Sequence, residues 1–169
     1  MVHGSTFSKN NLGMAAGLAT LQVIKDEKLV ENSARMGASI VAQLDALSAQ
    51  YELLGEVRGR GMMIGMQFVP PQSLKLKAAW KMLEAASTGL FCQMITVPLL
   101  TRHRILSQVA GHGSYVVKFI PPLTLSEDDC RWVVAAVTDV VADAHRVPGA
   151  LWNFGAGLAQ RAIGMKVAN

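Results

Sequence analysis

The sequence predicts an α+β fold, in which helices cover a small mixed sheet of about three strands and two long helices come first. Apolar residues recur at helical spacing over about 11–26 and again over about 27–50. Beyond residue 50, short apolar runs that stop at prolines alternate with further helical segments, and such runs are typical of strands. Two helices followed by this alternation indicate a layered α+β arrangement.

The two leading helices differ in their apolar surface. The helix over about 11–26 is apolar on most of its circumference, which predicts a mostly buried helix. Asn10 is its expected N-cap, because its side-chain oxygen can accept a backbone N–H of the first turn. Gly13 and Gly17 would let another backbone approach closely. The helix over about 27–50 carries a narrower apolar stripe with charged residues between.

Three strands and three more helices are expected after a connection over 51–56. The expected strands are 62–69, 92–97 and 115–120. The expected helices are 74–86, a long segment that Ser126 caps, and a short segment over about 150–164. Gly89 is the expected cap at the end of the helix over 74–86.

Composition limits the class of protein. Of the 169 residues, 51% are hydrophobic and 17% are charged, which indicates a globular chain with a core. We find no signal peptide pattern and no apolar run of the roughly 18–20 residues that a membrane span needs. Cys92 and Cys130 lack the spacing of a zinc site or a redox pair, so we expect no metal and a reduced, cytoplasmic setting.

Net charge does not point to nucleic acid. The chain carries a formal charge of +4, but its lysines and arginines are scattered. Aromatic residues make up only 6%, so stacking platforms for bases are scarce. We therefore expect neither nucleic acid nor a membrane as a partner.

A loop of small and hydroxyl residues, 3–10, stands directly before the first helix. Its Ser5 and Thr6 hydroxyls would lie just ahead of the helix N-terminus, whose free N–H groups and dipole attract anions. The pattern permits a phosphate site. An ordinary capped helix with a polar lead-in remains the alternative.

Lys118 is unusual because it stands inside an apolar strand, where alternation puts it on one face with Val116 and Ile120. Such a lysine either reaches solvent at an edge or faces a site. His112, in a glycine-flanked loop just before this strand, either lines a substrate channel or bonds the backbone. The segment 58–61, Arg-Gly-Arg-Gly, predicts a tight turn rather than a phosphate loop, because no Gly-Lys-Ser/Thr follows.

Three motifs resemble one enzyme family. His3-Gly4-Ser5-Thr6-Phe7, followed by Asn10, Leu12 and Ala15-Ala16, resembles the segment that opens the C-terminal part of class III pyridoxal-phosphate aminotransferases. The runs Val57-Arg58-Gly59-Arg60-Gly61-Met62-Met63-Ile64-Gly65 and Val117-Lys118-Phe119-Ile120-Pro121-Pro122-Leu123 resemble two later motifs of that family, in the same order. Ser8-Lys9-Asn10-Asn11 departs from the family's two glycines and Asn-Pro.

The resemblance implies a division of the chain and a set of roles. Residues 1–26 would form the cofactor-phosphate loop and linking helix, and 27–169 the C-terminal small domain of a fold-type I enzyme. Thr6, with Ser5 beside it, would bind the phosphate of pyridoxal 5'-phosphate across a dimer interface. Lys118 and His112 would lie on the substrate side.

The resemblance also implies amino-group transfer from an amine or amino acid to a carbonyl acceptor. Relatives that use α-amino acids place a carboxylate-pairing arginine at the position of Lys118. A lysine lacks the planar fork that suits that contact. Lys118 therefore favours a diamine or an aldehyde-bearing acyl chain as the substrate.

In the family, the Schiff-base lysine, the acidic partner of the pyridine nitrogen and the ring-stacking aromatic lie upstream of the His3 motif. We therefore expect a truncated enzyme with no catalytic residue of its own. The chain alone should be inactive and should not retain the cofactor. Its expected partners are a large cofactor domain and a second copy. The alternative is a non-catalytic dimerisation or regulatory module with the same fold.

Overall fold

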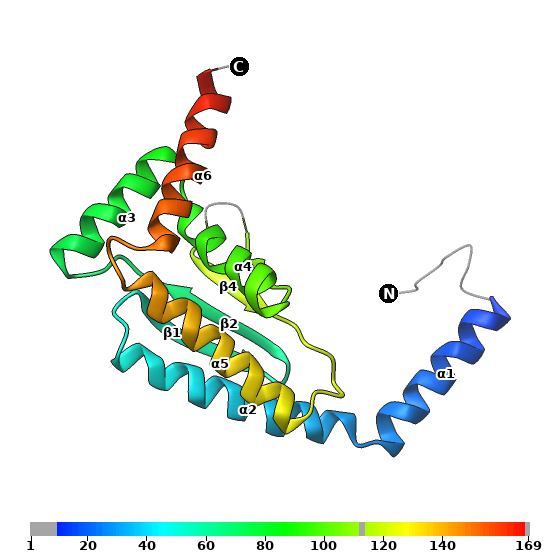
Figure 1. Ribbon diagram of the computed structural model, residues 1–169. Helices are drawn as coiled ribbons and strands as arrows, with labels where there is room; N and C mark the ends of the chain where they lie inside the picture. Colours follow the sequence, from blue (N-terminus) through cyan, green and yellow to red (C-terminus); the bar gives the residue numbers. More distant parts are fainter. Residues whose placement is uncertain (1–9, 112–113, 168–169) are drawn as a thin grey trace, which may run out of the picture.

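The computed structural model describes residues 10–111 and 114–167, and they form the expected α+β fold (Figure 1). The helices are α1 (Asn11–Asp26), α2 (Leu29–Asp45), the 3₁₀ turn η1 (Ala46–Ala49), α3 (Leu74–Ala86), α4 (Leu90–His103), α5 (Glu127–Ala144) and α6 (Ala150–Val167). The strands are β1 (Leu54–Arg60), β2 (Met63–Phe68), β3 (Gln108–Val109) and β4 (Val116–Phe119).

The sheet has four strands in the order β1-β2-β4-β3, rather than about three. Its three described pairs are all antiparallel, so the sheet is not mixed. Helices α2, α4 and α5 lie on one of its faces (Figure 1). That face carries the fully buried side chains of β2 and β4, which include Met66, Phe68 and Val117.

The expected strand 92–97 is wrong, because this segment lies within α4. Cys92, Met94, Ile95 and Leu99 are all 0% exposed, whereas Gln93 and Leu100 are exposed, so α4 is buried on most sides and open along one narrow face. A helix with so narrow an exposed face shows little amphipathic period, and a short apolar run then resembles a strand. The expected role of Gly89 is also wrong, because it is the N-cap of α4, with φ +79°, and Ser87 caps α3.

The expected connection 51–56 and turn 58–61 are also wrong in part. Strand β1 runs through Arg58, Gly59 and Arg60, and the reversal into β2 occurs at Gly61, with φ +55°. A Cβ atom on Gly37 of α2 would lie 2.0 Å from the Gly61 carbonyl oxygen. The bare backbone of α2 therefore packs against this turn, and it fixes the end of the β1–β2 hairpin.

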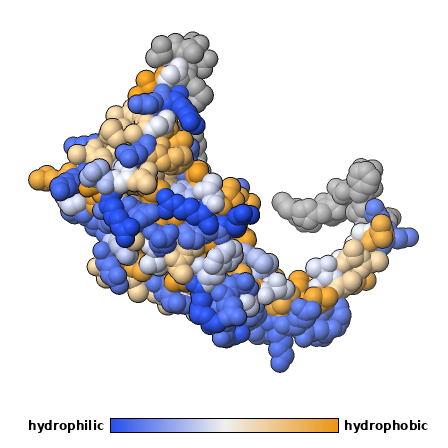
Figure 2. Space-filling model, viewed as in Figure 1, coloured by the Kyte–Doolittle hydropathy of each residue, from blue (hydrophilic) through white to orange (hydrophobic). Residues whose placement is uncertain are grey.

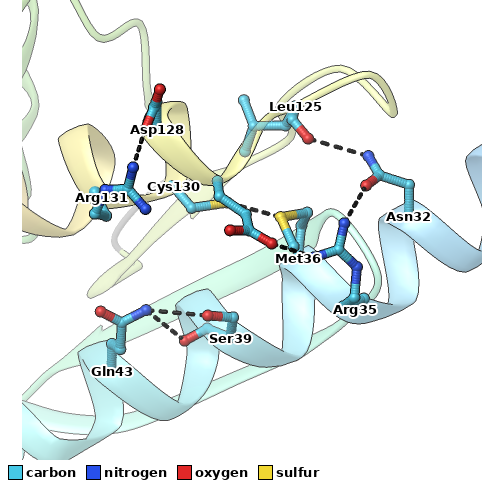
Figure 3. Close-up of polar contacts among 10 residues, drawn as sticks. Asn32, Arg35, Met36, Ser39, Gln43, Leu125, Asp128, Cys130 and Arg131 are labelled. Atoms are coloured by element: carbon cyan, nitrogen blue, oxygen red, sulfur yellow. Dashed lines mark hydrogen bonds and ion pairs between the residues drawn. The ribbon is translucent and has the colours of Figure 1, made fainter.

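Polar contacts join α2 to α5 at their ends (Figure 3). The Asn32 side-chain amide donates to the carbonyl oxygens of Leu123 (2.8 Å) and Leu125 (3.0 Å). The Arg35 guanidinium pairs with the Glu127 carboxylate at 2.6 Å. Ser126 caps α5 as expected, and it forms a capping box with Asp129.

Helix α1 extends away from the sheet and the other helices (Figure 1). Asn10 is its N-cap, as expected, and its side-chain oxygen accepts from the backbone N–H groups of Leu12 (3.0 Å) and Gly13 (3.2 Å). None of the helix's residues is buried, contrary to the expectation of a mostly buried helix. Figure 2 shows apolar side chains along it, and Leu12, Leu18 and Leu21 are at least 65% exposed. The apolar face that the sequence predicts is present, but it contacts no core in the described part of the chain.

Within the described residues, no single helix is long and apolar enough to cross a membrane. Only α3 and α4 taken together reach that length and apolarity, and they are bent by 100° at the break between them.

Candidate functional site

The face of the sheet opposite α2, α4 and α5 carries a row of four residues, one from each strand. Arg58 of β1 lies opposite Gly65 of β2, Gly65 lies opposite Lys118 of β4, and Lys118 lies opposite Gln108 of β3. Lys118 and Val116 are half-buried on this face, whereas Val117 and Phe119 are buried on the other. The alternation predicted for this strand is confirmed.

This face holds a groove of about 470 Å³, within the size range of small-molecule sites. Its lining includes three cations, Arg58, Arg60 and Lys118, and no acidic residue. Met63 and Ile120, which are 63% and 66% exposed, add apolar walls. The groove therefore combines positive charge with apolar surface, which suits an anion on an aliphatic chain.

The three cations differ in what they already bind. The Arg58 guanidinium donates to the Glu56 carboxylate at 2.9 Å and to the Gln67 side-chain oxygen at 3.2 Å. Arg60 and Lys118 have no hydrogen-bond or ion-pair partner among the residues that the structure describes. These two side chains therefore offer the free donors of the groove.

Gly65 makes room for the groove. A Cβ atom there would lie 3.3 Å from Val116 Cγ1 and 3.9 Å from the Arg58 carbonyl oxygen. The floor between Arg58 and Lys118 is thus bare backbone. Neighbouring strands lie about 4.8 Å apart, so the two cations begin roughly 10 Å from each other, with only Gly65 between them.

The sequence patterns did not predict two of these cations as site residues. Arg58 and Arg60 were assigned to a turn, but they are strand residues on the same face as Lys118. Their spacing of two residues is typical of one face of a strand, but the neighbouring glycines made the segment resemble a turn. The other expected site residues, Ser5, Thr6 and His112, lie outside the described residues.

The α1 N-terminus is the described part of the expected phosphate site. Asn10 already accepts from two of its N–H groups, those of Leu12 and Gly13. Fewer backbone donors are therefore free than the sequence suggested.

A second depression, of about 230 Å³, lies between α2 and α5 (Figure 3). Its polar groups bind one another: Arg35 pairs with Glu127, Arg131 pairs with Asp128, and the Gln43 amide donates to Ser39. Cys130, in its wall, has its Sγ 3.5 Å from Met36 Sδ. Since these charges are already paired, the open face of the sheet is the better candidate site.

The described histidines and cysteines take structural positions. His145 accepts from the Leu53 backbone N–H at 3.2 Å and contacts the Val141 carbonyl, and His103 lies 2.9 Å from Asp139. Burial raises the pKa of the Cys92 thiol to about 12, and it also raises the pKa of Cys130. No group of three His, Cys, Asp or Glu in the described part of the chain could hold a metal ion.

Comparison with known proteins identifies the family. The sequence model described as aminotransferase class-III matches residues 1–141. The chain belongs to the class III aminotransferases. Pyridoxal phosphate is the cofactor of this family.

Two curated class III relatives are 33% identical to the chain. One is alanine–glyoxylate aminotransferase 2 homolog 2, mitochondrial, of Arabidopsis thaliana, over 79% of the chain and 26% of that protein. The other is diaminobutyrate–2-oxoglutarate aminotransferase of Rhizobium meliloti, over 80% of the chain and 28% of that protein.

A solved transaminase structure has the same fold. The amine transaminase of an uncultivated Pseudomonas species, in its pyridoxal-phosphate-bound form, superposes with a TM-score of 0.66 at 30% identity. The match covers 84% of the chain and 30% of that structure. The chain therefore spans less than a third of the length of these class III aminotransferases, and α6 lies beyond the part that the family's sequence model matches.

Proposed function

We propose that the chain forms the C-terminal part of a pyridoxal-phosphate-dependent class III aminotransferase and supplies one wall of its substrate pocket. The reaction is amino-group transfer from an amine or amino acid to a carbonyl acceptor. The observation that carries the proposal is the position of Lys118. In a chain of this family, Lys118 lies in a groove on the open sheet face and has no partner among the described residues.

The groove favours one of the two expected substrate classes. Arg60 and Lys118 would repel a diamine, whose charges have the same sign. An aldehyde-bearing acyl chain with an acidic group would instead meet two free donors and the apolar walls formed by Met63 and Ile120. Lys118 binds the acidic group as a point charge and leaves its orientation to the walls.

The cofactor contact belongs to the loop before α1. Pyridoxal phosphate, when bound, supplies the electron sink that amino transfer needs. In the proposed homodimer, the Thr6 hydroxyl, with Ser5 beside it, donates to the cofactor phosphate in the neighbouring subunit's site. Asn10 caps α1 directly after this loop and fixes where the helix begins.

The test is Lys118→Ala in the complete protein that contains this chain. The KM of acid-bearing substrates should rise about tenfold or more, because a hydrogen bond to a charged group is worth about 1.5–3 kcal/mol. Cofactor content, read from visible absorbance, should not change. Lys81→Ala, an exposed lysine on α3, is the matched control. Unchanged kinetics with every active substrate would remove Lys118 from the pocket.

A further inference from the structure

Glu84 of α3 contacts both the start of the next helix and a residue 31 positions further along the chain. Its Oε2 atom accepts a hydrogen bond from the Tyr115 hydroxyl, and its Oε1 atom accepts from the backbone N–H of Gly89 at 3.3 Å. Glu84 lies in α3, Gly89 begins α4 with φ +79°, and Tyr115 stands directly before β4. One half-buried carboxylate thus ties the α3–α4 turn to the start of a strand.

Tyr115 is also held by its ring and its backbone. Its ring lies against that of Trp80, with centroids 5.5 Å apart, and Trp80 is one helical turn before Glu84 on α3. Its carbonyl oxygen accepts from the Phe68 backbone N–H at 2.8 Å, which extends the pairing of β2 with β4 by one residue. Side chains of α3 and the backbone of β2 therefore fix the same residue.

The position of Tyr115 also affects Lys118, which lies three residues further along β4. Strand β4 has only four residues and its neighbour β3 has two, so backbone pairing alone specifies their register weakly. A slip of one residue would turn Lys118 to the buried face and Val117 to the groove. In the observed register, the Tyr115 hydroxyl reaches Glu84 and Lys118 lies opposite Gly65. The same slip would turn the Tyr115 ring to the groove face and away from Glu84.

We infer that Glu84 is a positioning residue, which acts through Tyr115 to hold β4 in the register that presents Lys118 to the groove. Glu84 lies on the helix-covered side of the sheet and needs no contact with substrate. The importance of Lys118 for substrate rests on the proposed function. The effect of Glu84 on the register of β4 does not depend on the proposed function.

The test measures amide hydrogen exchange in the 169-residue chain by NMR. Tyr115→Phe keeps the ring packing on Trp80 and removes only the hydroxyl. Glu84→Leu removes the acceptor, and Glu84→Gln restores a carbonyl oxygen for the hydroxyl. Asp139→Asn is the matched control, because it removes an exposed carboxylate that pairs with His103 rather than with a residue of β4.

We expect Tyr115→Phe and Glu84→Leu to lower the protection of β4 amides at least about tenfold, with β1–β2 amides unchanged. Glu84→Gln should retain most of the protection, and Asp139→Asn all of it. Unchanged β4 protection in Tyr115→Phe would overturn the inference, and so would a loss that is equal across the whole sheet. Tyr115→Phe decides the matter if Glu84→Leu does not fold.

A second arm uses the complete aminotransferase. Tyr115→Phe should raise the KM of an acid-bearing substrate several-fold and leave kcat nearly unchanged, because a misplaced Lys118 weakens binding. A loss of β4 protection without any change in KM would support the hold of Glu84 on β4 and would count against the role of Lys118. The two arms therefore separate a failure of this inference from a failure of the proposed function.

Discussion

Gly65 lies directly opposite Lys118 across the β2–β4 pair, and on its other side it lies opposite Arg58. The one residue of this row without a side chain therefore stands between the two cations. Its bare backbone forms the floor of the groove, and the groove depends on that small residue as much as on the charges around it.

Gly65→Val should fill the groove and keep the fold. Valine suits a strand, and its Cβ would lie 3.3 Å from Val116 Cγ1 and 3.9 Å from the Arg58 carbonyl oxygen, so we expect a change in stability of about 1 kcal/mol or less. In the complete protein, the KM for an acid-bearing substrate should rise about tenfold. Gly157→Ala, in open space on α6, is the control. Full activity of Gly65→Val would show that substrate does not enter this groove.

The Tyr115 hydroxyl should make stability depend on alkaline pH. Its hydrogen bond to Glu84, with burial, raises the pKa of Tyr115 from 10.0 to about 12. Because the native pKa is the higher one, the native state binds this proton more tightly, and the stabilisation is fully present below about pH 10. It is lost as the pH rises through about 12.

Denaturant unfolding at a series of alkaline pH values measures this loss. The chain has two tyrosines, so tyrosinate absorbance in Tyr115→Phe leaves the titration of Tyr51 alone, and the difference belongs to Tyr115. The loss of unfolding free energy between about pH 10 and 12 should be absent from Tyr115→Phe. A Tyr115 that titrates near pH 10 in the native chain would contradict the contact with Glu84.

The Cys92 thiol should be inert in the native chain. Cys92 is 0% exposed, and burial raises its pKa from 9.0 to about 12, so its thiolate population at pH 8 is about a thousandfold lower than for an ordinary thiol. Alkylation followed by mass spectrometry should label Cys92 only after unfolding. Cys130 serves as an internal comparison, because its pKa is also raised. Rapid labelling of Cys92 without denaturant would show that α4 is not packed as described.

Helix α1 should drive self-association of the 169-residue chain. Leu18 and Leu21 are 69% and 65% exposed on a helix with no buried residue. Contiguous apolar surface of this kind associates in water. Size-exclusion chromatography with light scattering should show oligomers, and Leu18→Lys should reduce them. Leu74→Lys, at an isolated exposed leucine of α3, should leave the amount of oligomer unchanged. A monomer at high concentration would rule this out.

Local signals predicted some elements well. Helix α3 has the expected bounds, and the Ser126 cap of α5 follows from a hydroxyl residue before three acidic residues. The Lys118 face followed from simple alternation. Helix α4 was not predicted because its apolar residues run almost without interruption and hide the helical period. Strand β1 was not predicted because Arg-Gly-Arg-Gly resembles a turn. The Glu84–Tyr115 bond joins residues 31 apart, and no local pattern encodes such a pair.

The central claim is that this chain supplies only part of a cofactor site. Hydroxyls of Ser5 and Thr6 offer few hydrogen bonds against the entropy that binding costs. The covalent link needs a lysine that the family places in its other domain. The direct measurement is incubation of the chain with pyridoxal phosphate, borohydride reduction and peptide mapping by mass spectrometry. We predict weak labelling spread over several lysines. One lysine labelled at unit stoichiometry, with the matching visible absorbance, would show that the chain holds a complete cofactor site and would contradict the account.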